Sequence, residues 1–123
     1  DASADSLFVF KDGTWSSVAP PQKQSISADG EATTSGERER ILNMVSADKD
    51  GSLVAHYRHP RDYDRLYLKD KGGFEILPRI PKKRYDNRGR VTQDGGYEGY
   101  VELGIGGAAR SQGGERYVST ASF

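Results

Sequence analysis

Residues 80 to 90, IPKKRYDNRGR, place five cationic side chains around a single aromatic ring. The cations are Lys82, Lys83, Arg84, Arg88 and Arg90, and the ring is Tyr85. Cations pair with phosphates or carboxylates, while an exposed ring stacks on a base or packs into a pocket. The spacing therefore indicates either a binding surface or a solvated turn between two strands.

Similar side chains occur upstream of this stretch, where arginines alternate with Tyr57, Tyr63 and Tyr67. Several aspartates lie among them, and such neighbouring carboxylates weaken the positive potential of a surface. The candidate binding residues for a polyanion or a protein partner are Arg58, Arg61, Arg65, Lys82, Lys83, Arg84, Tyr85, Arg88 and Arg90.

The segment SADKDGSLVAHY resembles a calcium-binding EF-hand loop at a few positions. Asp48, Asp50 and Gly51 occupy the third, fifth and sixth places of that loop. Ser46 and Tyr57 stand at the first and twelfth places, where the EF-hand needs anionic ligands. With two anionic ligands missing, we predict an acidic β-turn and no metal site.

The chain contains two histidines, His56 and His59, in the segment HYRHPRD. Pro60 disfavours a helical conformation at His59, and two strand residues three apart point to opposite faces. A shared metal site with Asp62 or Asp64 is therefore not expected. We predict one packed and one solvated histidine near a strand end.

No catalytic motif marks a particular nucleophile, since the chain has no cysteine and no G-x-S-x-G pattern. The glycine-rich segment 104–114 lacks the Lys-Ser/Thr signature of a phosphate-binding loop and is predicted to connect strands. We therefore expect a non-catalytic protein without a cofactor. A small hydrolase with a histidine-containing site is the third hypothesis.

The 123 residues suit one domain, and the hydrophobic fraction of 34% indicates a thin core. The formal net charge is zero, but residues 1–50 carry about −4 and residues 56–90 about +6. Affinity for a polyanion would therefore be local. The longest apolar runs are far too short to span a bilayer, and the start at Asp1 suggests a processed or excised chain.

Turn signals flanked by strand-forming residues recur along the chain. The pair Asp12-Gly13 separates Leu7–Phe10 from Thr14–Val18, and Gly72-Gly73 follows a second alternating segment. A third hairpin is predicted around 94–96, the Asp-Gly-Gly sequence. Repeated hairpins predict an antiparallel all-β domain.

Residues 19–37 are rich in Pro, Gly, Ser and Thr and are predicted to form a long flexible loop. After this loop, residues 37–46 fit two structures equally well. Thr34 and Glu37 have the spacing of a helix capping box, but the apolar residues that follow also suit a strand. Helix and strand both stay open here.

The fold predicted from these patterns is a small antiparallel barrel or sandwich of about seven to nine short strands, with one possible short helix. The predicted core residues share apolar or aromatic side chains in the expected strands. They are Leu7, Val9, Trp15, Leu53, Tyr67, Leu68, Phe74, Ile76, Val101, Leu103 and Val118.

The function predicted from the sequence is a binding module that engages a macromolecular partner through its loops and the basic, tyrosine-containing surface at 56–90. A protein partner is the first expectation, since the neutral overall charge gives no general attraction to polyanions. RNA or single-stranded DNA, held by Lys82, Lys83, Arg84 and Tyr85, is the alternative.

Overall fold

The structure is a computed structural model that describes residues 5–27, 30–58, 64–70, 72–97, 104–110, 113 and 115–121. Over these residues the chain is all-β and contains no helix, so no described helix could cross a membrane. The strands are β1 Leu7–Lys11, β2 Thr14–Val18, β3 Gln22–Ile26, β4 Ala32–Arg38, β5 Ile41–Ala47, β6 Leu53–Arg58, β7 Arg65–Lys69, β8 Phe74–Ile76, β9 Pro81–Tyr85, β10 Val91–Tyr97, β11 Gly104–Arg110 and β12 Arg116–Ala121.

A four-stranded antiparallel sheet, in the order β5-β6-β7-β8, forms the centre of the molecule. Strand β6 is buried along most of its length, and its alternate side chains pack on opposite faces of the sheet. One face carries Leu53, Ala55, Tyr57, Tyr67 and Ile76. The other face carries Val54 and Leu66, with Met44, Leu68, Leu77 and Ile80 packed against them.

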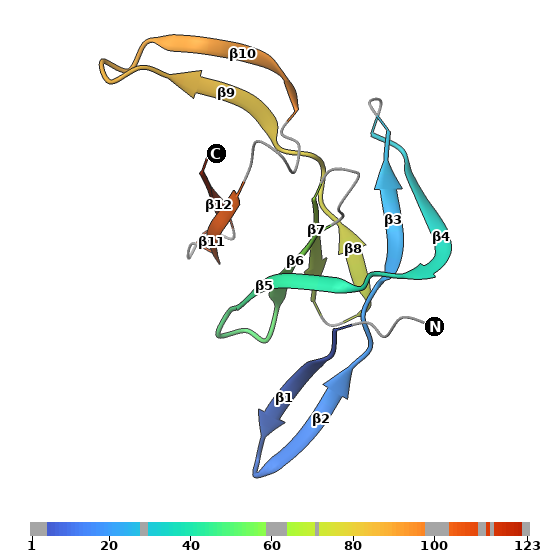
Figure 1. Ribbon diagram of the computed structural model, residues 1–123. Coiled ribbons are helices and arrows are strands. Elements are labelled where there is room, and N and C mark those ends of the chain that lie inside the picture. The colour runs from blue at the N-terminus through green and yellow to red at the C-terminus, as the bar shows by residue number, and fades with distance from the viewer. Residues whose placement is uncertain are drawn as a thin grey trace.

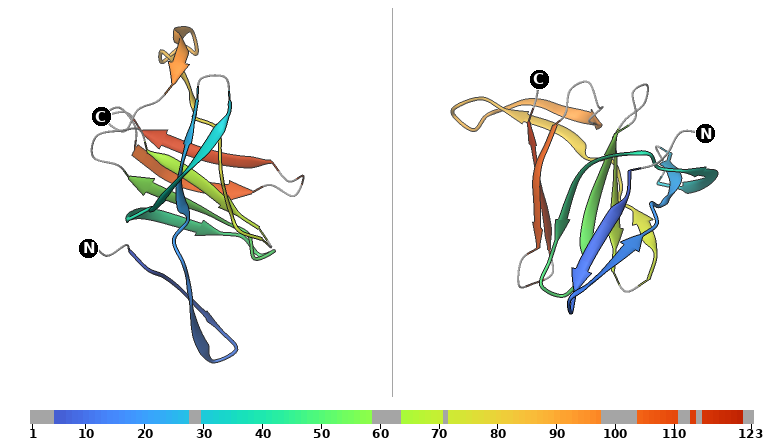
Figure 2. Two further views of the ribbon diagram at one scale, coloured as in Figure 1. Left: turned by 90° about the vertical axis from the view of Figure 1, so that its right-hand side faces the viewer. Right: turned by 60° about the horizontal axis from the view of Figure 1, so that its bottom comes forward.

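Four two-stranded hairpins accompany the central sheet (Figure 1). The β3–β4 hairpin lies beside β8, and β11 of the β11–β12 hairpin lies beside β5 (Figure 2). The β1–β2 and β9–β10 hairpins instead extend away from the central sheet in different directions. The fold thus consists of a small core with two protruding arms.

The predicted all-β class with antiparallel pairing is confirmed, and none of the described sheets closes into a barrel. Residues 37–46, for which the sequence left helix and strand open, form the end of β4, the β4–β5 junction at 39–40 and most of β5. The prediction of a long loop at 19–37 is wrong, because β3 and most of β4 lie within this range. Gln24 pairs with Thr34 and Ser25 with Thr33, so polar residues, among them β-branched threonines, form a ladder here rather than a loop.

Two of the three predicted hairpins are confirmed. Asp12 and Gly13 have φ angles of 53° and 75° and join β1 to β2, with Lys11 paired to Thr14. Positive φ at both central positions is the geometry that favours Asp-Gly in a tight hairpin. Gly72 and Gly73 lie between β7 and β8, where Lys69 pairs with Phe74.

The hairpin predicted around 94–96 is wrong. Gly95 and Gly96 lie inside β10, where φ angles of 132° and 77° accompany a register shift between Asp94 and Tyr97. Glycine tolerates the positive φ of such a β-bulge. The chain reverses earlier, between Tyr85 and Val91, where Gly89 has a φ of 79°.

The predicted core is confirmed in its centre and wrong at its N-terminal end. Leu53, Tyr67 and Ile76 are buried, and Leu7, Leu68 and Phe74 pack partly buried against the clusters. Val9 and Trp15 are 38% and 67% exposed, because β1 and β2 pair only with each other and extend from the sheet. Val101 and Leu103 lie outside the described residues, as does the side chain of Val118.

Substitution of Gly13 should weaken the β1–β2 hairpin alone. Alanine at a φ of 75° is disfavoured, by about 1 kcal/mol, so Gly13→Ala should speed amide hydrogen exchange in β1 and β2 severalfold. The matched control is Gly36→Ala in β4, where φ is not positive and no atom crowds the new methyl group. Equal exchange in both variants would contradict the turn geometry.

Candidate binding surface

The β9–β10 hairpin brings together six of the nine candidate binding residues. Lys82, Lys83, Arg84 and Tyr85 lie on β9, and Arg88 and Arg90 lie in the turn that follows. Figure 1 shows the hairpin reaching beyond the central sheet. All residues of β10 are exposed, so both strands present their surface to solvent.

Strand alternation divides the hairpin into two faces. Lys83 and Tyr85 share the exposed face, and Val91 joins them because it pairs directly with Tyr85. Tyr85 is 57% and Val91 50% exposed. We name Lys83, Tyr85 and Val91 the tyrosine face. Lys82 and Arg84 lie on the opposite, half-buried face.

The turn at the tip is held by the side chain of Asp86. Its Oδ1 accepts hydrogen bonds from the backbone amides of Arg88 and Arg90, both at 2.9 Å. These amides hold the pKa of Asp86 below its ordinary value, with a smaller contribution from the Arg90 guanidinium. An aspartate that binds the backbone two residues on is a standard turn former, so this carboxylate has a structural role.

The hairpin carries exposed ion pairs. Arg90 Nε lies 2.9 Å from Asp86 Oδ2, and Lys83 Nζ lies 3.8 Å from Asp94 Oδ2. Exposed pairs of this kind contribute little to stability, about 0–1 kcal/mol. Residues 81–97 carry five basic and two acidic side chains, so the hairpin keeps a net positive charge of +3.

The other three candidate residues do not join this surface. Arg58 is exposed at the end of β6, on the central sheet. Arg61 lies outside the described residues. Arg65 begins β7 and is only 1% exposed, because its guanidinium pairs with the carboxylate of Glu39. A buried arginine cannot contribute to an exposed partner surface.

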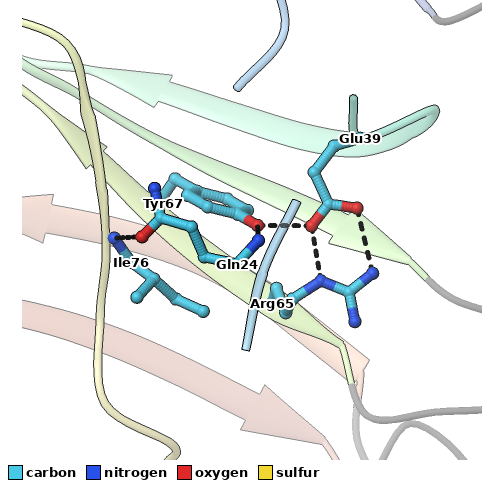
Figure 3. Close-up of polar contacts among 5 residues, drawn as sticks. All are labelled: Gln24, Glu39, Arg65, Tyr67 and Ile76. Atoms are coloured by element: carbon cyan, nitrogen blue, oxygen red, sulfur yellow. Dashed lines mark hydrogen bonds and ion pairs between the residues drawn. The ribbon is translucent and has the colours of Figure 1, made fainter. Parts of the chain in front are cut away.

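The Arg65–Glu39 pair belongs to a buried polar network (Figure 3). Arg65 Nε donates to Glu39 Oε2, and one terminal nitrogen of Arg65 donates to Glu39 Oε1 at 2.9 Å. The Tyr67 hydroxyl also donates to Glu39 Oε2, at 2.5 Å. Glu39 is itself only 2% exposed, so its charge is balanced inside the protein.

The same network connects the central sheet to the β3–β4 hairpin. The backbone amide of Gln24 donates to the Tyr67 hydroxyl at 3.0 Å, and the amide of Ile76 donates to Gln24 Oε1 at 3.3 Å. No pattern in the sequence predicts this network. Glu39 and Arg65 lie 26 residues apart, in segments that otherwise read as exposed and charged.

Burial raises the pKa of both tyrosines in the core. For Tyr67 the hydrogen bond that its hydroxyl donates to Glu39 raises the pKa further. For Tyr57 burial and then the negative charge of Glu39 raise the pKa to about 12. Both phenols are therefore neutral over the ordinary pH range.

His56 is the packed histidine that the sequence predicts, with 1% exposure. Its Nδ1 accepts a hydrogen bond from Asn43 Nδ2 at 3.0 Å, and its Nε2 donates to Asp64 Oδ2 at 2.7 Å. Both ring nitrogens are engaged, so the imidazole has no nitrogen left to act as a general base. His59 lies outside the described residues.

The acidic turn at Asp48–Ser52 is confirmed as the connection between β5 and β6. The amide of Gly51 donates to the Asp48 carbonyl at 3.0 Å, and the Ser52 hydroxyl donates to Asp50 Oδ1 at 2.7 Å. The Asp50 carboxylate thus orders the turn. Within the described residues, no group of three or more histidine or carboxylate side chains is placed to hold a metal ion.

Comparison with known proteins gives no match. No protein-family model, no curated protein and no solved structure matches this chain.

Proposed function

We propose that the protein is a non-catalytic binding module that engages a protein partner through the β9–β10 hairpin. The observation that carries the proposal is the exposure of Tyr85 and Val91 beside cationic side chains on an arm that extends from the core. Tyrosine and arginine are enriched among the residues that contribute most to protein interfaces. A hairpin also offers unpaired backbone edges that can extend a partner's sheet.

The chemistry of the hairpin indicates what the partner surface must supply. The tyrosine face requires an apolar pocket for the Tyr85 ring, and the net charge of +3 requires surrounding carboxylates. Asp86 and Asp94 lie on the same hairpin and would repel a continuous phosphate backbone. A protein surface can place opposite charges against both signs, which favours a protein partner over a nucleic acid.

Substitution of Tyr85 tests the proposed binding of a protein partner. Tyr85→Ala should weaken partner binding about 30-fold or more, because an interface anchor is worth at least about 2 kcal/mol. The matched control is Tyr117→Ala, whose ring is 64% exposed on the β11–β12 hairpin. The measurement is retention of proteins from a nuclease-treated extract of the source cells on each immobilised variant, followed by the affinity of the purified partner. Equal retention by the two variants would refute the proposal.

RNA or single-stranded DNA is the second candidate. The specific observation in its favour is that Tyr85 and Lys83 share one exposed face, which is the combination used to stack a base and pair its phosphate. Phosphate contacts release counterions, so the affinity for a labelled oligonucleotide must fall as salt rises. Absent binding at low salt, or binding that does not change with salt, would exclude this candidate.

A further inference from the structure

A pocket of about 210 Å³ lies away from the β9–β10 hairpin, between β3, the junction of β4 with β5, and the end of β6. Most of the residues that line it are charged. They are Lys23, Glu37, Arg38, Glu39, Arg40 and Arg58. No sequence pattern predicts this pocket, because its residues come from three separate segments.

The charge of this pocket is positive. Four cations face two carboxylates, and the Glu39 carboxylate already accepts hydrogen bonds from Arg65 and Tyr67. With the Glu39–Arg65 pair balanced, the four cations are opposed by Glu37 alone, which leaves about +3. The side chains of Lys23, Arg40 and Arg58 make no hydrogen bond or ion pair with another described residue.

The framework of the pocket is held by hydrogen bonds to two backbone carbonyls. A terminal nitrogen of Arg38 donates to the Pro20 carbonyl at 2.8 Å, and the amide of Glu39 donates to the Pro21 carbonyl at 2.9 Å. These bonds tie the β4–β5 junction to the segment before β3. A site held in place before binding loses less conformational entropy when a ligand arrives.

We infer that this pocket binds a small phosphate monoester. A monoester carries a charge of about −1.5 to −2 near neutral pH, which suits a pocket of about +3 better than a singly charged diester does. Guanidinium groups bind phosphate oxygens in pairs. The volume equals about seven water molecules, at about 30 Å³ each, which fits a phosphate group with a few attached atoms.

Binding is tested by calorimetry with inorganic phosphate, O-phosphoserine and dimethyl phosphate. The two dianions should bind about tenfold or more tightly than the diester. Their affinity should rise between about pH 5 and pH 7, as the second phosphate proton is lost near pH 6. Equal affinity for the diester, or no binding of phosphate and phosphoserine, would overturn the inference.

Substitutions of pocket residues test whether phosphoserine binds in this pocket. Arg40→Gln and Arg58→Gln should each weaken phosphoserine binding about tenfold, since each removes a charged hydrogen-bond donor. Glu37→Gln should strengthen it severalfold, because the substitution removes a repelling carboxylate. Lys49→Gln, which removes one exposed positive charge at the β5–β6 turn, is the matched control and should have no effect. An equal loss in Lys49→Gln would show unspecific charge attraction and refute the site.

This inference is independent of the proposed protein partner. The pocket residues lie on the core, and the partner-binding residues lie on the β9–β10 hairpin. Tyr85→Ala should therefore leave phosphoserine affinity unchanged. Failure of one proposal would therefore leave the other unaffected.

Discussion

Replacing Arg65 with methionine is expected to lower the free energy of unfolding by about 3–5 kcal/mol. The substitution leaves the Glu39 carboxylate 2% exposed and without the two hydrogen bonds that the guanidinium donates. A buried charge without its partner is far more costly than the loss of an exposed pair. Urea unfolding, followed by circular dichroism, measures the change.

Two further variants separate loss of charge balance from loss of packing. The double variant Glu39→Met with Arg65→Met removes both charges together and should recover most of the lost stability, because no lone charge stays buried. Arg90→Met breaks the exposed pair with Asp86 and should change the free energy of unfolding little. The interpretation fails if Arg65→Met costs no more than Arg90→Met.

The buried network also determines the field of the proposed anion pocket. Glu39 lines that pocket, and Arg65 balances its charge from the interior. Without Arg65, both Glu37 and Glu39 would oppose the four cations of the pocket, which would lose part of its attraction for an anion. Stability and anion binding therefore depend on one ion pair, although Arg65 itself is too deeply buried to touch a ligand in the pocket.

The local features of the fold could be predicted from the sequence. Alternation of apolar and polar residues predicted strands, and Asp12-Gly13 predicted a tight turn because positive φ at both positions requires such residues. Asp94-Gly95-Gly96 carries a similar signal and forms a bulge instead. Whether a glycine pair turns the chain or bends a strand depends on the register with β9, which is a long-range property.

The candidate surface could be predicted only where its residues are close in sequence. Lys82, Lys83 and Tyr85 fall on one hairpin because a single turn joins its strands. Arg65 resembles them in the sequence, but it is buried because β7 lies in the middle of the central sheet and Glu39 reaches it from the β4–β5 junction. No periodicity within either segment reports that distant contact.

Val9 and Trp15 show the converse case, because both were predicted to lie in the core and both are exposed. Their segment has the apolar content of core strands, yet the β1–β2 hairpin packs few of its side chains against the sheet. Phe10 and Trp15 instead contact each other, with ring centroids 5.0 Å apart. Composition predicts that a strand forms, whereas burial depends on what the rest of the chain places against it.

Alkaline pH is expected to destabilise the protein through its buried tyrosines. Burial raises the pKa of Tyr57 to about 12 in the folded state, against an ordinary value of about 10. Burial and the Glu39 hydrogen bond also raise the pKa of Tyr67. Above about pH 10 the unfolded chain loses these protons while the folded protein still holds them, so the free energy of unfolding must fall.

For Tyr57 the stabilisation is complete below about pH 10 and is lost as the pH rises towards about 12, by about 3 kcal/mol in total. Urea unfolding at about pH 8, 10 and 11 measures the decline. Absorbance of the tyrosinate ion at the same pH values shows whether the buried tyrosines of the folded protein stay protonated.

Tyr67→Phe identifies the contribution of the second tyrosine. At neutral pH this variant should lose about 1–3 kcal/mol of stability, because the Glu39 carboxylate loses a donor in a buried site. Above about pH 10 its stability should fall less steeply than that of the parent, because one titrating phenol is gone. Tyr85→Phe, with an exposed ring, should change neither value. If Tyr67→Phe and Tyr85→Phe have the same alkaline profile, the Tyr67 hydroxyl is not buried against Glu39, and the network that joins β7 to the β4–β5 junction is incorrectly assigned.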